Sequence, residues 1–110
     1  CDICQMVCPW NLRFAPTNGD PAFAPRPDGP NPSIAAELVL TAQEFNRKFK
    51  DSPVKRAKRR GYLRNVAVVA GNARNTELLP ALEVASKDEE ALIRAHADWA
   101  IKTLKVSENL

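Results

Sequence analysis

Apolar residues recur at helical spacing in the C-terminal two thirds of the chain. Leu63, Val66, Ala67 and Ala70 follow an i, i+3, i+4, i+7 pattern, which indicates one buried face of a helix. The valine-rich run at 66–69 lies inside this pattern, and no segment shows the sustained alternation of a strand. The pattern therefore predicts an all-α fold for residues 34–110.

Polar residues mark where these helices begin. Thr41 followed by Glu44 is a capping box, and Ser52-Pro53 combines an N-cap with a proline in the first turn. Gly61 is expected to bend or split the helix that Ser52 opens. The predicted helix starts are Ser33, Thr41, Ser52, Asn75 or Thr76, and Asp88, the last helix running to about Lys105.

Two of the predicted helices share a motif. The stretches LRNVAVVA, from Leu63, and IRAHADWA, from Ile93, both read apolar-Arg-x-x-Ala-x-x-Ala and lie 30 residues apart. A large anchor followed by two small residues favours close approach of helices, and its recurrence resembles HEAT-type helical repeats. We expect Trp99 to belong to the core of this repeat.

The N-terminal third has a different character. Seven of the nine prolines lie between Pro9 and Pro32, which predicts an irregular connector. Phe14 and Phe23 are expected to pin this connector to a neighbouring surface. The predicted organisation is a cysteine motif at 1–11, a proline-rich connector at 12–33 and a HEAT-like helical domain at 34–110.

Composition is that of a soluble globular protein. The chain has 110 residues, of which 45% are hydrophobic and 26% charged, and no apolar run is long enough to cross a bilayer. No export leader is visible. We expect a cytoplasmic monomer without membrane contact.

Positive charge is concentrated in one segment. Residues 47–64 contain nine of the sixteen lysines and arginines but one acid, Asp51, giving a net charge of +8 by residue count. Salt bridges within the helices cannot neutralise this excess, so we favour a nucleic-acid interface over a solvated helix face. The candidate contacts are Lys55, Arg56, Lys58, Arg59, Arg60 and Arg64.

Two residues in this segment have a second interpretation. Arg64 is the repeat counterpart of Arg94, so it is equally a candidate for bonding groups between helices. Tyr62, or an arginine, is a candidate for stacking on an unpaired base.

The three cysteines form the motif C-x2-C-x3-C-P at the start of the chain. A disulfide would leave one thiol free, and a zinc site would need a fourth ligand, for which His96 is the one histidine. A chance clustering is the third alternative. The fourth is iron–sulfur, because Cys1, Cys4 and Cys8 coincide with the last three cysteines of the ferredoxin run C-x2-C-x2-C-x3-C-P. On that hypothesis Cys1 and Cys4 bind one [4Fe-4S] cluster, Cys8 binds another, and Trp10 shields a cluster from water.

Three blocks together resemble a known family. CDICQMVCPWN, SPVKRAKRRGYLRNVAVVAGN and LIRAHADWAI occur in the order found in the C-terminal part of the tRNA epoxyqueuosine reductase family. The resemblance implies an oxidoreductase with two [4Fe-4S] clusters and cobalamin that reduces epoxyqueuosine to queuosine in the tRNA anticodon stem-loop, fed by an electron donor. It implies that the HEAT-like part contributes to tRNA binding.

The same resemblance limits what this chain contains. It implies that the remaining cluster ligands, the cobalamin-binding domain and the catalytic residues lie upstream. We therefore expect no catalytic residue in this chain and no activity from it alone. The alternatives are another two-cluster iron–sulfur oxidoreductase with a helical-repeat tail, and a zinc-stabilised helical module that binds RNA or protein.

Overall fold

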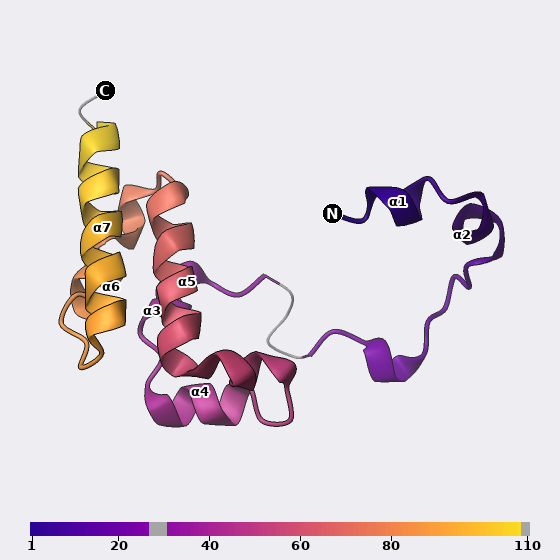
Figure 1. The fold of residues 1–110 in the computed structure, drawn as a ribbon, viewed down its shortest axis with the longest axis horizontal. Helices are drawn as coiled ribbons and strands as arrows, with labels where there is room; N and C mark the ends of the chain where they lie inside the picture. Colours follow the sequence, from indigo (N-terminus) through magenta and orange to yellow (C-terminus); the bar gives the residue numbers. More distant parts are fainter. Residues whose placement is uncertain (27–30, 109–110) are drawn as a thin grey trace. The chain divides into compact units, whose positions relative to one another are not determined.

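A computed structural model describes residues 1–26 and 31–108. The chain divides into two compact units, Cys1–Asn31 and Pro32–Leu110, which are described separately here. Every regular element in the described ranges is an α-helix or a 3-10 helix (Figure 1). The all-α prediction is confirmed, whereas the HEAT-like repeat and the domain boundaries remain predictions.

The first unit consists of short helical turns. They are α1 (Ile3–Met6), α2 (Pro9–Phe14) and the 3-10 turn η1 (Pro21–Phe23). None of these elements has a buried residue. Phe14 and Phe23 were expected to pin the connector, but both rings are exposed. The unit has too few apolar residues in contact to form a core of its own.

The second unit is a layered helical domain. Its elements are α3 (Ile34–Leu38), α4 (Ala42–Lys48), η2 (Pro53–Ala57), α5 (Lys58–Asn72), η3 (Thr76–Leu78), α6 (Leu79–Ala85) and α7 (Ala91–Glu108). The two longest helices, α5 and α7, lie side by side (Figure 1). Helix α6 packs against α7, and α3 packs against both α5 and α6.

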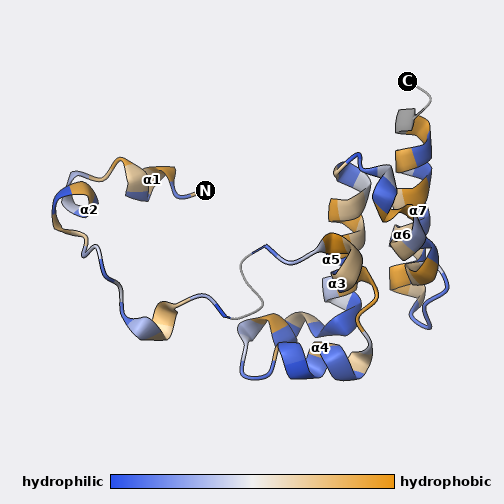
Figure 2. Cartoon of the chain, turned by 180° about the vertical axis from the view of Figure 1, so that it is seen from behind, coloured by the Kyte–Doolittle hydropathy of each residue, from blue (hydrophilic) through white to orange (hydrophobic). Residues whose placement is uncertain are grey.

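The repeated motif forms the centre of the core. Leu63, Ala67 and Ala70 of α5, like Ile93, Ala97 and Ala100 of α7, have no exposed surface. The apolar faces of these helices are visible in the hydropathy colouring of Figure 2. The small alanines let the two helices approach closely, as the motif predicts. Other buried members of the core are Leu38, Leu78, Leu82, Ala85 and Leu104.

Most of the predicted caps form, although Ser33, at the N-cap position of α3, makes no side-chain capping hydrogen bond. Thr41 and Glu44 form the complete capping box of α4, with reciprocal side-chain and backbone hydrogen bonds. The side chains of Ser52 and Asn75 accept hydrogen bonds from backbone N–H groups two residues later. Asp88 does the same for Glu90 just before α7.

The break in the segment after Ser52 lies at Lys58, and not at Gly61 as the sequence suggested. Lys58 has a φ of 57°, and it separates the 3-10 turn η2 from α5. This extended backbone with positive φ costs a residue with a side chain about 1–3 kcal/mol. The hydrogen bonds of the following residue, Arg59, to Leu40 and Asp88 in two separate loops stabilise the turn.

None of the described helices is long and apolar enough to span a bilayer.

Candidate functional site

The exposed basic surface is made by η2 and the first turn of α5. Lys55, Arg56, Lys58 and Arg60 all have exposed side chains. Within residues 1–26 and 31–106, no ion pair involves any of them. We call these four residues the basic patch. Because no carboxylate neutralises it, the patch presents a concentrated positive potential to the solvent.

Arg59 lies in the same segment, but its guanidinium points into the fold. Its Nε donates to the carbonyl of Leu40 at 2.7 Å, and its two Nη atoms donate to Asp88 at 3.1 and 2.5 Å. The carboxylate raises the pKa of Arg59, and the guanidinium lowers the pKa of Asp88. A carboxylate occupies the bidentate fork of Arg59 in this structure, which gives the residue a structural role, and its contact with phosphate stays a prediction.

Arg64 does not have the inter-helix role that its repeat counterpart suggested. Its Nε and Nη2 donate to Asn65 Oδ1, at 3.2 and 3.1 Å, on its own helix. Arg94 instead donates to the backbone carbonyls of Asp88 and Glu89, both at 2.7 Å, and so holds the loop before α7. Arg64, which is half-buried, remains a candidate for contacting a ligand beside the basic patch.

A buried carboxylate fixes the helices that carry the patch. Glu37 of α3 is 4% exposed and accepts from Lys48 of α4 and, at 2.6 Å, from the Tyr62 hydroxyl of α5. Its two partners satisfy the buried charge. Burial raises the pKa of Tyr62, and the hydrogen bond and charge of Glu37 raise it further.

Tyr62 is therefore a structural residue. Its ring centroid lies 5.7 Å from that of Phe45 and 4.9 Å from that of Phe49. Two aromatic rings pack against Tyr62 and its hydroxyl is bonded to Glu37, so these contacts account for the residue without a ligand. Its stacking on an unpaired base stays a prediction.

Trp99 was expected in the core, but its side chain is 43% exposed. It follows Ile93 by six positions, which places it about 120° away from the buried stripe around the helix. Val68, Ala95, His96 and Trp99 line a pocket of about 390 Å³. The helical angle of Trp99 is a sequence signal that could have identified this surface.

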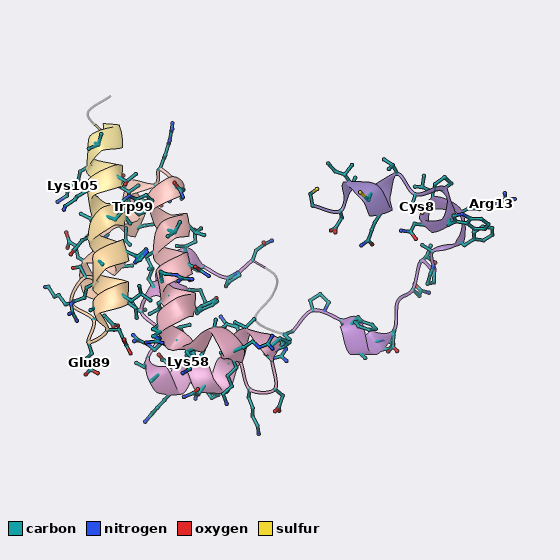
Figure 3. All side chains as sticks on the ribbon, in the orientation of Figure 1. Cys8, Arg13, Lys58, Glu89, Trp99 and Lys105 are labelled. Carbon is teal, nitrogen blue, oxygen red and sulfur yellow. The ribbon has the colours of Figure 1, made fainter. Side chains whose placement is uncertain are left out.

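The cysteine segment has three free thiols. Cys1 and Cys4 are exposed, and Cys8 is half-buried between α1 and α2 (Figure 3). Cys8 has extended backbone and Pro9 begins α2, so the chain changes direction directly after the third cysteine. The Asn11 side chain donates to the carbonyl of Gln5 at 3.3 Å and links the two turns.

Thiolates are the donor type that iron–sulfur clusters require, and Cys1, Cys4 and Cys8 supply three. In the part of the chain that the structure describes, no group of three or more His, Cys, Asp or Glu residues is placed to hold one metal ion. The donor type thus fits a cluster, but Cys1, Cys4 and Cys8 do not by themselves form a complete site in this structure.

The zinc alternative would use His96 as a ligand. Its Nδ1 lies 2.8 Å from the carbonyl of Leu92, one turn earlier in α7. A carbonyl only accepts, so Nδ1 carries the proton and Nε2 is the nitrogen free to act as a ligand. Trp10 stacks on Phe14 with centroids 5.4 Å apart, and its shielding of a cluster remains a prediction.

Comparison with known proteins identifies relatives across nearly the whole chain. An enzyme from Xanthomonas campestris is 39% identical over 102 residues, which is 92% of this chain and 28% of the relative. A Pseudomonas aeruginosa relative is 40% identical over 103 residues, again covering 28% of the relative. An Escherichia coli K12 relative is 35% identical over 102 residues, or 26% of its length. All three carry the same name.

The chain is similar to part of epoxyqueuosine reductase. It spans little more than a quarter of the length of these epoxyqueuosine reductases, so most of each relative has no counterpart in it. No family model matches the chain. No solved structure matches it either.

Proposed function

We propose that this chain is the C-terminal part of an epoxyqueuosine reductase, an oxidoreductase of queuosine biosynthesis. The observation that carries the proposal is 39–40% identity to two such enzymes across 92–93% of the chain. The reaction removes the epoxide oxygen from a modified base in tRNA, so it needs a source of electrons and a surface that holds tRNA. The chain offers residues for both requirements, and the cytoplasm is where we expect it to act.

The cysteines are the residues for electron transfer. In the proposal, Cys1 and Cys4 bind one [4Fe-4S] cluster and Cys8 binds a second, with the other thiolates supplied from upstream. Clusters of this kind relay electrons, and cobalamin held by the upstream part supplies the reductive chemistry. The chain's own contribution is to supply three cysteines within eight residues, with Pro9 beginning α2 directly after the third.

The basic patch is the surface for tRNA. Lys55, Arg56, Lys58 and Arg60 are exposed and unneutralised, and they neighbour Arg64 along α5. Phosphate contacts made by such residues release counterions, which gives affinity that falls with salt. Arg59 acts differently: its bonds to Leu40 and Asp88 hold α5 so that the patch faces outward. The proposed target is the anticodon stem-loop.

Charge reversal tests the tRNA surface. With about four phosphate contacts, log K of the unmodified chain should fall against log salt with a slope of about −3 to −4. The double variant Arg56→Glu, Arg60→Glu should weaken binding at least 10-fold at low salt and flatten this slope. The matched control is Lys87→Glu, Lys102→Glu, two reversals at exposed lysines outside the segment. Equal weakening by both pairs would mean that net charge, and not the patch, determines binding.

A chimera tests the reductase assignment. The matched segment of the Escherichia coli epoxyqueuosine reductase is replaced by this chain, and epoxyqueuosine reduction in tRNA is measured together with bound iron. We expect activity and iron loading, and we expect Cys1→Ser, Cys4→Ser or Cys8→Ser to abolish activity and lower iron content. A folded chimera that binds zinc and no iron would instead support the zinc-stabilised module.

A further inference from the structure

A pocket with one aromatic wall lies where α5 and α7 meet. Val68 of α5 and Ala95, His96 and Trp99 of α7 line its volume of about 390 Å³. Its lining is largely apolar, and it is formed entirely within the second unit. Figure 3 labels Trp99 on α7, on the side toward α5. None of the roles proposed above uses this pocket.

The indole ring of Trp99 is held against the neighbouring helix. A Cβ atom built on Gly71 would lie 2.7 Å from Cζ3 of Trp99, so the ring edge touches the backbone of α5. One turn later in α7, the Thr103 hydroxyl donates to the backbone carbonyl of Trp99 at 2.9 Å. The side chain is nevertheless 43% exposed. A large flat ring that is fixed on one edge and open to solvent can stack on a planar ligand with little loss of rotamer entropy.

His96 adds one oriented polar atom to the pocket. Because its Nδ1–H donates to the carbonyl of Leu92, the neutral ring offers Nε2 as a hydrogen-bond acceptor. The pocket therefore combines a flat apolar wall with one acceptor. This combination suits a heteroaromatic ring that carries an exocyclic amine.

The charge beside the pocket indicates what the planar ligand is attached to. Arg60, Arg64 and Val68 are four residues apart in turn, so they follow one side of α5. Each step advances about 6 Å along the helix, which places both arginines within about 12 Å of the pocket along the axis. Arg60 belongs to the basic patch. A chain of phosphates along this side of α5 would lead directly to Trp99.

We propose that this pocket binds an unpaired nucleobase of an RNA whose phosphates contact Arg60 and Arg64. The proposal rests on the proposed function, since it assigns a base site to the same RNA surface. The base stacks on Trp99, and its exocyclic amine can donate to Nε2 of His96. Stacking accepts every base, so the pocket adds affinity for unpaired RNA more than sequence preference.

The test uses the fluorescence of Trp99. Trp10 and Trp99 are the two tryptophans of the chain, so Trp10→Phe leaves Trp99 as the sole reporter. Two probes of equal length are compared, a short oligoadenylate and an abasic ribose-phosphate chain. We expect the oligoadenylate to quench Trp99 on binding and the abasic chain to leave its emission unchanged.

Two kinds of variant separate stacking from packing. Trp99→Ala should weaken oligoadenylate binding about 10-fold without changing its salt slope, and Trp99→Phe should restore most of the loss. Ala95→Glu fills the mouth of the pocket from an exposed position and keeps Trp99 in place. Ala91→Glu is its matched control, with the same charge change at an exposed position of α7 outside the pocket.

The outcomes distinguish this inference from the function on which it rests. Salt-dependent binding of both probes without quenching of Trp99 overturns the base site and leaves the phosphate surface standing. Equal effects of Ala95→Glu and Ala91→Glu also overturn the base site. Failure of the unmodified chain to bind either probe overturns the base site and the phosphate surface together, while the reductase assignment is judged by the chimera.

Discussion

At Gly71, a hydrogen atom in place of a side chain sets the distance between two helices. A methyl group there would meet Cζ3 of Trp99 at 2.7 Å and both Cα and Cβ of Ala100 at 3.1 Å. The indole can move, but the backbone of α7 at Ala100 cannot move without disturbing the core. Gly61, in the same helix, has only Ala57 Cβ nearby, at an ordinary 3.7 Å.

These two glycines should respond oppositely to the same substitution. Gly71→Ala should lower the free energy of unfolding by about 1–3 kcal/mol, because it overpacks the contact of α5 with α7. Gly61→Ala should raise it by about 0.5–1 kcal/mol, because alanine is the better helix former and has room. Urea denaturation of both variants checks the pair. Equal effects would show that helix propensity alone acts at both positions.

The Arg59–Asp88 pair should make the free energy of unfolding depend on pH in the acidic range. The hydrogen bonds from Arg59 lower the pKa of Asp88 in the folded state. The stabilisation is therefore complete above the unfolded pKa of about 3.9 and is lost as pH falls through the lower folded value. Asp88→Asn should cost about 1–3 kcal/mol at neutral pH and flatten the acid limb of the stability curve.

The control for this prediction is Glu89→Gln, at the exposed neighbouring carboxylate. It removes one negative charge near Arg59 without removing a hydrogen bond to it. Thermal unfolding followed by circular dichroism between neutral and acidic pH compares the two variants. A stability curve of Asp88→Asn that keeps its acid dependence would contradict the assignment.

The local sequence could not reveal that Arg59 differs from the basic residues around it. Its partner Asp88 is 29 residues away, and the contact exists only because the first turn of α5 meets the loop before α7. Trp99 is the opposite case, since its angle on α7 already separates it from the buried stripe. The exposure of a residue follows from its position around a helix and can be read from the sequence. A partner that is distant along the chain cannot be read in this way.

At the scale of elements, Glu37 connects three helices through one carboxylate. Lys48 of α4 and Tyr62 of α5 both donate to it, and Phe45, Phe49 and Tyr62 form an aromatic cluster beside it. The orientation of α4 depends on this buried contact, and so does the path of the chain from α4 into η2. A charged residue buried in this way is stable only while its partners remain.

The single tyrosine of the chain reports on this contact. Burial, and then Glu37, raise the pKa of Tyr62, so its phenol should ionise well above the usual value of about 10. The stability contributed by the neutral phenol is complete below about pH 10 and is lost as pH rises through the folded pKa. Ultraviolet titration of the folded chain measures this directly.

A variant that keeps the shape of Glu37 gives the control for the titration. Glu37→Gln should move the pKa of Tyr62 part of the way back, because burial remains while the charge is removed. Titration of Tyr62 at its ordinary pH in the unmodified chain would contradict the contact.

The sequence predicted where helices begin better than it predicted where a helical segment is interrupted. The capping box at Thr41 and Glu44 and the caps at Ser52 and Asn75 are local chemistry, and all three are confirmed. The break at Lys58 was missed because glycine, at position 61, is the usual signal for a bend. Lys58 adopts its positive φ where the tertiary bonds of Arg59 stabilise the turn.

At the scale of the whole molecule, the buried core belongs to one unit. All of its fully buried large side chains, from Leu38 to Leu104, lie in the unit Pro32–Leu110. The described part of the first unit contributes no buried residue. Hydrophobic burial should therefore stabilise the second unit by itself.

Residues 32–110 expressed alone should unfold cooperatively. Their melting temperature should lie within about 2 °C of that of the 110-residue chain, because the core is unchanged. Circular dichroism at equal concentrations makes the comparison. A large drop, or a loss of cooperativity, would show that residues 1–31 contribute to the stability of the helical unit.

The two candidate sites differ in how far the sequence could describe them. The basic patch follows from charge counting, and the structure adds that the neighbouring Arg59 is paired with Asp88. For the cysteines, spacing indicates the chemistry, but three thiols cannot define the geometry of a site that needs a fourth.

The alanines between α5 and α7 also affect how the domain orders. Ala67, Ala70, Ala97 and Ala100 have no rotamers to lose, so the closest helix contact forms without cost in side-chain entropy. The amide protons in the middle of these two helices should consequently be the slowest in the chain to exchange with solvent deuterium. The helix pair that continues from the basic patch is then the most persistent of the described structure, and the surface it carries stays assembled while shorter helices open and close.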